Sequence, residues 1–356
     1  MITESGGQKK GSAHFTRNSL IYVMMNIIID KKSRRHRMQE SSERIRVSAR
    51  ADSGHAGMRL DQVAAALFPD YSRARLQKWI RSGDLMVDGR VAKTTYRING
   101  NETLCLDAQA EPQGTAMPQD IPLDVIHADE DLVIINKPAG LVVHPAAGHP
   151  DGTLQNALLY FDEKLAVLPR SGIVHRLDKD TSGVMVVARS LRAHTSLVDQ
   201  LQTRKMSRIY RAVATGDIVA GGTVDAPIGR HPRDRKRMAV VPSGKPAVSH
   251  YRVLKRFNGV TYIGVSLESG RTHQIRVHMA HMGHALVGDP VYGRNLKMKR
   301  GLPAGLVDAV RSFPRQALHA HRLSLVHPAT LLPVTFEARL PEDFKHLLTR
   351  LEAESA

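Results

Sequence analysis

Residues 172–189 constrain the fold most strongly, because a loop crowded with charged and polar residues leads directly into an apolar run. The loop spans His175 to Gly183, and the run spans Val184 to Ala188. An uninterrupted apolar run of this length after a turn predicts a buried central strand. A polar loop fixed to such a strand can hold a reactive side chain in a defined position.

Asp178 is the candidate reactive group of this loop. Arg176 and Lys179 flank it, and a carboxylate close to cations stays ionised at neutral pH, as a nucleophile or base requires. The alternative is an ordinary Asx-turn, since Asp, Thr, Ser and Gly are common turn residues. A metal at Asp178 and Asp180 is disfavoured, because Lys179 intervenes and no further acidic cluster follows.

Length and charge limit the class of protein. A chain of 356 residues exceeds one typical core, so two domains are expected. Its 51 Lys and Arg against 34 Asp and Glu favour an anionic partner, most simply nucleic acid, over a membrane surface. Cys105 is the only cysteine, which excludes an intrachain disulfide and a cysteine-based zinc site and fits a reducing, cytoplasmic setting.

Residues 1–50 differ from the rest and are interpreted as a disordered or spurious extension. The apolar run Leu20–Ile29 is too short to cross a bilayer, and a Lys- and Arg-rich segment follows it instead of a cleavage site. Met38 is a candidate for the true start. The intact mass of protein from its own cell would decide between Met1 and Met38.

Residues 51–110 predict a compact unit with two helices. Leu60, Val63, Ala64 and Leu67 form one helix face, Ser72 is positioned to cap the second helix, and Asp88-Gly89 predicts a turn between short strands. A stripe of cations could follow a phosphate backbone, although a solvated polar face is the usual alternative. The stripe comprises Arg73, Arg75, Lys78 and Arg81.

Residues 111–120 read as a linker, and residues 121–350 predict a second domain of strands and helices. Ser190 should cap a helix, and Asn258-Gly259 predicts a hairpin between strands 248–257 and 260–268. Residues 229–237 form a basic loop whose expected role is phosphate contact. Its cations are Arg230, Arg233, Arg235, Lys236 and Arg237.

Residues 270–283 form a second candidate site on a predicted helix. Thr272 is a plausible cap, and Ile275, Met279 and Met282 recur at helical spacing. Arg276 lies next to this apolar face, so it requires an acidic partner if it is half-buried. Four histidines, His273, His278, His281 and His284, resemble a metal cluster, but their spacing is not that of a helical zinc pair. Backbone hydrogen bonds or surface titration are the favoured roles.

Two family resemblances rest on these motifs. Residues 58–106 resemble the S4 RNA-binding module through Arg59-Leu60-Asp61, the helix after Ser72 and the segment 85–91. Residues 120–340 resemble the RluA-type pseudouridine synthases. The motifs that carry this second resemblance are the segments 136–145, 172–183, 270–280 and 286–293.

The resemblance implies an α+β fold, in which a mixed, mainly antiparallel sheet flanked by helices and loops follows a small α/β S4-like domain. It implies conversion of uridine to pseudouridine in RNA by base flipping, which exposes bonds that are inaccessible in a stack. Asp178 matches the essential aspartate, as nucleophile or base, and Arg276 matches its partner. Tyr210 matches the tyrosine that stacks on uracil, Arg176 the residue that fills the gap, and Ile275 would pack beside the base.

The resemblance also implies a partner, a stem-loop of large-subunit (23S) ribosomal RNA, as naked RNA or in an assembling 50S particle. No membrane partner is implied, and a monomer is the default. No cofactor is implied, and the sequence contains neither a Walker-type phosphate loop nor a Rossmann glycine pattern. The competing hypotheses are a non-catalytic RNA-binding factor and a metal-dependent nuclease, and the nuclease would need acidic ligands that the motifs do not provide.

Overall fold

The computed structural model describes residues 44–68, 71, 73–109, 116–145, 148–234, 237–293 and 301–355. The predictions for residues 1–43, for the Ser72 cap, and for Arg235 and Lys236 lie outside the described residues. None of the helices in the described ranges is long and apolar enough to cross a membrane.

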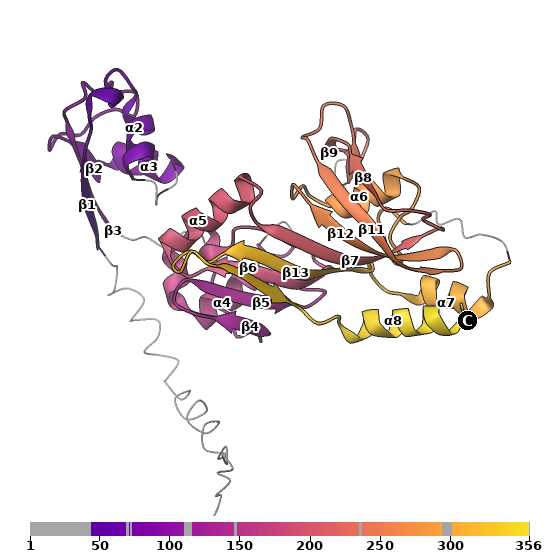
Figure 1. Ribbon diagram of the computed structural model, residues 1–356. Coiled ribbons are helices and arrows are strands. Elements are labelled where there is room, and N and C mark those ends of the chain that lie inside the picture. Colours follow the sequence, from indigo (N-terminus) through magenta and orange to yellow (C-terminus); the bar gives the residue numbers. More distant parts are fainter. Residues whose placement is uncertain are drawn as a thin grey trace, which may run out of the picture.

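The amino-terminal unit packs two helices against a three-stranded antiparallel sheet in the order β1-β3-β2 (Figure 1). Its core contains Leu60, Val63 and Ala64 of the predicted helix face, together with Leu76 and Trp79 of the second helix. Asp88 and Gly89 both have positive φ, which confirms the predicted turn. The elements are β1 (Arg44–Arg50), η2 (Ser53–His55), α2 (Leu60–Leu67), α3 (Arg73–Ser82), β2 (Leu85–Val87) and β3 (Thr103–Gln109).

Strand β1 corrects part of the predicted extension at residues 1–50. Residues 44–50 pair along their whole length with β3, and Arg44 forms a salt bridge with Asp107 at 2.6 Å. Basic residues alternate with small or apolar ones in this segment, so the sequence shows little hydrophobic signal. The pairing partner, which lies almost 60 residues later, makes it a strand.

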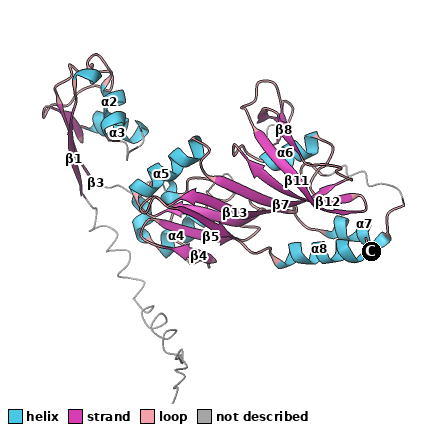
Figure 2. Cartoon of the chain, in the orientation of Figure 1, coloured by secondary structure: helices cyan, strands magenta, loops and turns pink. Residues whose placement is uncertain are grey.

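The larger unit is built on a nine-stranded sheet (Figure 2). The order is β4-β5-β6-β13-β7-β12-β11-β8, and β14 pairs with β13. Among the strands in the described residues, β6 and β13 form the only parallel pair, which confirms the mixed, mainly antiparallel α+β architecture. The strands are β4 (Val125–Ala128), β5 (Leu132–Lys137), β6 (Ser182–Ala188), β7 (Ser207–Thr215), β8 (Gly222–Asp225), β11 (Val248–Phe257), β12 (Val260–Leu267), β13 (Leu318–Val326) and β14 (Pro333–Glu337).

The apolar run after the polar loop is the central strand β6, and all seven of its residues are buried. Glycines bracket the loop between η4 and β6 for a steric reason. A Cβ on Gly172 would lie 2.0 Å from the Ala188 carbonyl oxygen, and a Cβ on Gly183 would lie 2.1 Å from that of Ala320. Both glycines also have positive φ, so the backbone at each end of the loop is fixed by close packing.

Helices and short turns cover this sheet. Ser190 accepts a hydrogen bond from the Ala193 amide in the first turn of α5 (Leu191–Gln202), as the sequence predicts, and Thr153 accepts one from the Asn156 amide of α4 (Leu154–Phe161). Strands β9 and β10 form a separate two-stranded hairpin, and α7 and α8 lie side by side at the carboxyl-terminal end (Figure 1). The remaining elements are α4 (Leu154–Phe161), η3 (Glu163–Val167), η4 (Pro169–Gly172), α5 (Leu191–Gln202), β9 (Ile228–Arg230), β10 (Met238–Val240), α6 (Gln274–His281), α7 (Ala304–Ser312) and α8 (Glu342–Ala353).

Candidate active site

A cavity of about 570 Å³ opens beside the polar loop, and Ile173, two residues before the loop, also lines it. The loop, β7 and the start of α6 supply most of its wall. The five residues singled out for the catalytic domain all line it: Arg176, Asp178, Tyr210, Ile275 and Arg276. The structure therefore brings together residues that are almost 100 positions apart in the sequence.

The polar loop is held by groups outside it. Lys137, at the end of β5, is 1% exposed, and its Nζ donates to the carbonyl oxygens of Pro138, Leu141 and Lys179 at 2.8–2.9 Å. Arg315 donates to the carbonyl oxygen of Asp180 at 3.1 Å. The backbone on the carboxyl side of Asp178 is thus fixed by two buried cations from distant segments.

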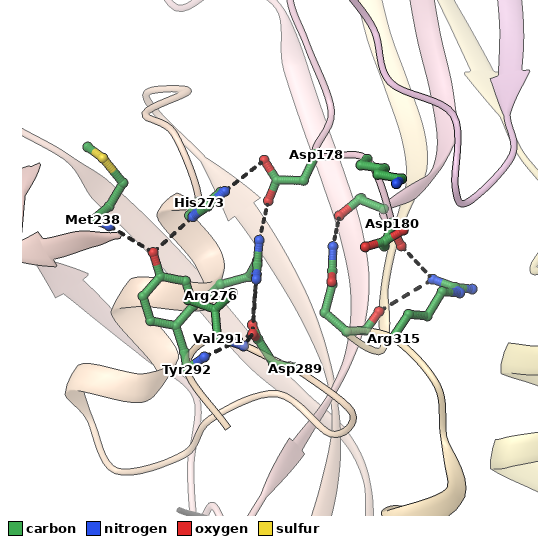
Figure 3. A network of polar contacts seen from close by, with 12 residues as sticks. Asp178, Asp180, Met238, His273, Arg276, Asp289, Val291, Tyr292 and Arg315 are labelled. Atoms are coloured by element: carbon green, nitrogen blue, oxygen red, sulfur yellow. Dashed lines mark hydrogen bonds and ion pairs between the residues drawn. The ribbon is translucent and has the colours of Figure 1, made fainter. Parts of the chain in front are cut away.

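Arg276 on α6 joins two carboxylates (Figure 3). Its Nη1 donates to Asp178 Oδ2 at 3.0 Å, while Nε and Nη2 donate to the two oxygens of Asp289 at 2.7 and 2.9 Å. Burial alone would lower the pKa of Arg276, but the hydrogen bonds and charges of Asp289 and Asp178 outweigh it and raise that pKa. Burial alone would raise the pKa of Asp289, but its hydrogen bonds with Arg276 and the charge of Arg276 hold the Asp289 pKa below the ordinary value.

The two carboxylates differ in exposure. The Asp289 side chain is fully buried, and one of its oxygens also accepts from the backbone amides of Val291 and Tyr292. The Asp178 side chain is 16% exposed and faces the cavity. Asp289 can therefore position the guanidinium, while Asp178 keeps an oxygen accessible to a bound molecule.

His273 and Tyr292 extend this network. Tyr292 Oη accepts from the Met238 amide at 3.0 Å and lies 2.8 Å from His273 Nδ1 (Figure 3). Donation of the hydroxyl proton to Nδ1 places the proton of a neutral imidazole on Nε2, which lies 3.8 Å from Asp178 Oδ1. Burial lowers the pKa of His273, which favours this neutral form. The rings of Tyr292 and His273 also meet edge to face.

The start of α6 differs from the prediction. The N-cap residue is His273, in the left-handed conformation with φ of 56°, and not Thr272. Gln274 accounts for the difference, because its side-chain oxygen accepts from the Arg271 amide at 3.0 Å and its amide group donates to the Val248 carbonyl at 2.9 Å. This turn directs His273 and Arg276 toward the cavity.

The four histidines do not converge. His278 is buried between Ser249 and the Ala226 carbonyl oxygen, and His284 bonds to the Thr215 carbonyl oxygen. His281 is exposed, and of these four histidines only His273 lines the cavity. Within the described ranges, no group of three His, Cys, Asp or Glu residues is arranged to hold a metal ion.

Tyr210 and Ile275 form apolar parts of the wall. Tyr210 is on β7 and 7% exposed, Ile275 is on α6 and 4% exposed, and burial raises the pKa of the Tyr210 hydroxyl. Arg176 is exposed at the margin of the cavity. The site thus combines an apolar wall and a carboxylate with an exposed cation at its margin.

The cations predicted to contact RNA are partly engaged within the protein. Arg73 donates to Asp61 at 2.7 Å, and Arg75 donates to the Val167 carbonyl oxygen at 3.1 Å while its guanidinium stacks on Trp79. Lys78 and Arg81 are exposed. In the hairpin, Arg230 and Arg233 are exposed, and Arg237 lies over the Tyr292 ring. An RNA-binding role for these cations stays a prediction.

Sequence reasoning missed Asp289, His273 as a cavity residue, and Tyr292. The need of a half-buried Arg276 for an acidic partner was a valid signal, but Asp178 alone was assigned to it. Asp289 lies 13 residues beyond Arg276 in a short turn, and nothing in the local pattern distinguishes it from a turn aspartate.

Comparison with known proteins gives the class. Residues 131–281 match the RNA pseudouridylate synthase family model, and residues 58–104 match the S4 domain. The chain belongs to the RNA pseudouridylate synthase family and carries an S4 domain. It is therefore a pseudouridine synthase, and the non-catalytic and nuclease alternatives are set aside.

Individual relatives within this family show which of its members this chain is similar to. The chain is 55% identical over 313 residues to ribosomal large subunit pseudouridine synthase D of Pseudomonas aeruginosa, covering 88% of this chain and 98% of the relative. It is 49% identical over 314 residues to the protein of that name from Escherichia coli K12, covering 88% and 96%. The solved structure of human RNA Pseudouridylate Synthase Domain Containing 4 matches with a TM-score of 0.51 and 28% identity, over 64% of this chain and 92% of that one.

Proposed function

We propose that this enzyme converts specific uridines to pseudouridine in large-subunit ribosomal RNA, and that Asp178 is its reacting carboxylate. The single observation that carries the proposal is the Asp178–Arg276 pair, 3.0 Å apart, on the wall of a cavity that Tyr210 and Ile275 also line. The names of the relatives support the choice of RNA.

The reaction needs little from the protein beyond position and charge. The bond between ribose C1′ and uracil N1 breaks with its electron pair staying on uracil, the detached ring turns, and C5 bonds to C1′. The C5 proton then passes to a base and on to solvent, and N1 takes up a proton from solvent, so that no atom is gained or lost overall. Asp178 acts at the sugar, either by attack on C1′ or by removal of the C2′ proton. Arg276 orients this carboxylate through its hydrogen bond to Oδ2, and Arg276 is itself held by Asp289.

The cavity residues provide for a flipped nucleotide. Tyr210 and Ile275 offer a flat apolar contact for a uracil ring, which replaces the stacking lost when the base leaves the helix. Arg176 is exposed at the entrance, where its guanidinium can occupy the space that the nucleotide vacates. The exposed cations Lys78, Arg81, Arg230 and Arg233 would hold the RNA by its phosphates.

The test is release of tritium from large-subunit ribosomal RNA labelled at uracil C5. Asp178→Asn keeps the shape of the side chain and should abolish release, whereas Asp180→Asn, two residues away and outside the cavity wall, should retain it. Equal release by wild type and Asp178→Asn would refute the role of Asp178. No release by the wild-type enzyme from this RNA would refute the choice of substrate.

A second measurement separates the two roles of Asp178. Deuterium at ribose C2′ should slow the reaction if the carboxylate removes that proton. It should leave the rate essentially unchanged if the carboxylate attacks C1′.

A further inference from the structure

Arg208 is a buried cation on the cavity wall without a protein counter-ion. It is 8% exposed, and it lies on β7 two residues before Tyr210, so both side chains project from the same face of the strand. Its Nε is buried without a hydrogen-bond partner. In the described part of the chain, no carboxylate forms an ion pair with Arg208.

The other two arginines that are buried as residues in the described part of the chain, Arg276 and Arg315, form ion pairs. Arg276 contacts Asp178 and Asp289, and Arg315 contacts Asp343 at 2.6 and 2.9 Å. Burying a charge without a partner is costly, and native structures rarely do so without a functional reason. Arg208 therefore differs from its counterparts in lacking the anion that its environment requires.

The Arg208 guanidinium lies close to the Gly270 backbone. A Cβ at Gly270 would lie 2.7 Å from Arg208 Nη1, so the guanidinium lies directly against the backbone of the opposite wall. Gly270 and Arg208 both line the cavity. The buried guanidinium therefore lies beside the cavity, where an anionic group of a bound molecule can reach it.

We propose that Arg208 is a substrate-binding residue whose missing counter-ion is an anionic oxygen of the bound RNA. This inference rests on the proposed entry of a flipped uridine into the cavity. Two kinds of oxygen have the required charge: a phosphate oxygen next to the flipped nucleotide, and a uracil carbonyl oxygen, which becomes negative when the N1–C1′ bond breaks and uracil leaves with the electron pair. The planar fork of a guanidinium suits either acceptor.

The test compares Arg208→Met and Arg208→Lys with Arg211→Met as the matched control. Arg211 is on the same strand, projects from the opposite face and also has a buried nitrogen without a partner, but it does not line the cavity. Because Arg208 has no protein partner to lose, Arg208→Met should unfold at the same temperature as wild type or higher. A clearly lower unfolding temperature would indicate a structural role and overturn the proposal.

Two readouts on a large-subunit RNA stem-loop separate the sources of the anion. If the oxygen belongs to a phosphate, Arg208→Met should weaken binding, reduce the slope of log K against log salt by about 0.7–0.9, and leave the single-turnover rate at saturation unchanged. If it belongs to uracil, binding and slope should persist while that rate falls about 10²-fold or more. Arg208→Lys should recover part of the loss in either case.

Wild-type binding, rate and salt dependence in Arg208→Met would refute the inference, as would equal losses in Arg211→Met. Failure of the proposed function is a separate outcome, because the wild-type enzyme itself would then release no tritium from this RNA.

Discussion

Each of the two units contains a cluster of aspartate and arginine side chains, but the ratio of carboxylates to guanidiniums is opposite in the two clusters. In the S4 domain, the fully buried Asp61 accepts from Arg59, Arg73 and Gln77 at 2.7–3.4 Å, and the Arg59 and Arg73 side chains are 41% and 52% exposed. In the catalytic domain, one guanidinium that is 5% exposed serves Asp289 and Asp178. The Asp61 carboxylate is therefore fully occupied by hydrogen bonds within the S4 domain. In the catalytic domain one guanidinium is shared by two carboxylates, which leaves an oxygen of Asp178 accessible to a molecule in the cavity.

The electrostatics follow the same division. Burial alone would raise the pKa of Asp61, but the hydrogen bonds of Arg59, Arg73 and Gln77 outweigh it and hold that pKa far below the ordinary value. Those cations can return to water if the carboxylate is removed. Arg276 cannot, and neither can Asp289, so the cost of breaking each arrangement should differ.

Arg276→Met is the strongest test of this difference. It should leave the buried Asp289 without a cation, which lowers the free energy of unfolding by about 3–5 kcal/mol, and it should reduce tritium release by about 10³-fold or more. Thermal unfolding and single-turnover assays measure the two losses.

Adding Asp289→Asn to Arg276→Met then separates the loss of stability from the loss of activity. The double variant removes the uncompensated charge but keeps an oxygen for the amides of Val291 and Tyr292, so stability should recover in large part. Activity should not recover. A double variant that regains both would show that Arg276 is needed only to neutralise Asp289.

Asp61→Asn tests the other side of the comparison and should cost less. Its half-exposed arginines can be hydrated, so we expect a loss of about 2 kcal/mol, confined to the unfolding of the S4 domain. The single-turnover rate at saturating RNA should stay near that of wild type, because Asp61 is not among the cavity residues. A fall in that rate comparable to the effect of Arg276→Met would break the comparison.

The pH dependence of Asp61 has a defined sign. Because its folded pKa is held below the ordinary value of 3.8, its contribution to stability is present above that pH and is lost as the pH falls below it. The stability difference between wild type and Asp61→Asn should therefore shrink on acidification.

The sequence predicted local features well and long-range ones unevenly. The Ser190 cap and the hairpin at Asn258-Gly259 depend on neighbouring residues, and both are present. Strand β1 and the Asp289 contact depend on partners far along the chain or across a turn, and neither could be read from its own segment. The pairing of Asp178 with Arg276 was available only through family resemblance, since 98 residues separate them.

A second contrast involves buried charges that hold backbone groups. In the S4 domain, Glu102 accepts from the amides of Asn99, Gly100 and Asn101, and these bonds outweigh burial and lower its pKa to about 2. In the catalytic domain, Lys137 holds three carbonyl oxygens instead, and burial lowers its pKa to about 7. The anion fixes a surface turn, whereas the cation fixes the loop that carries Asp178.

Lys137→Met sharpens this contrast through pH. Between pH 7 and the ordinary value of 10.5, the unfolded chain binds a proton at Lys137 that the folded chain has lost, so the free energy of unfolding should rise with pH. The rise should be on the order of a few kcal/mol in wild type and absent from Lys137→Met. Denaturant unfolding at several pH values measures it, and identical slopes in the two proteins would contradict the buried, titrating Lys137.

Tyr292→Phe probes the least costly part of the catalytic network. The variant keeps the aromatic face that contacts the Arg237 and Arg276 guanidiniums but loses the hydroxyl between the Met238 amide and His273. Net hydrogen-bond energies predict a loss of about 1 kcal/mol in stability. Without the hydroxyl, the His273 ring is no longer held in one tautomer, so the rate should be roughly threefold to tenfold lower. The matched control is Tyr262→Phe, a partly buried tyrosine outside the cavity. The Tyr292 hydroxyl connects β10 to His273, which lies beside Asp178. A rate defect limited to Tyr292→Phe would show that the site depends on this hydroxyl. Equal rates in Tyr292→Phe and Tyr262→Phe would show that the aromatic ring of Tyr292 alone suffices.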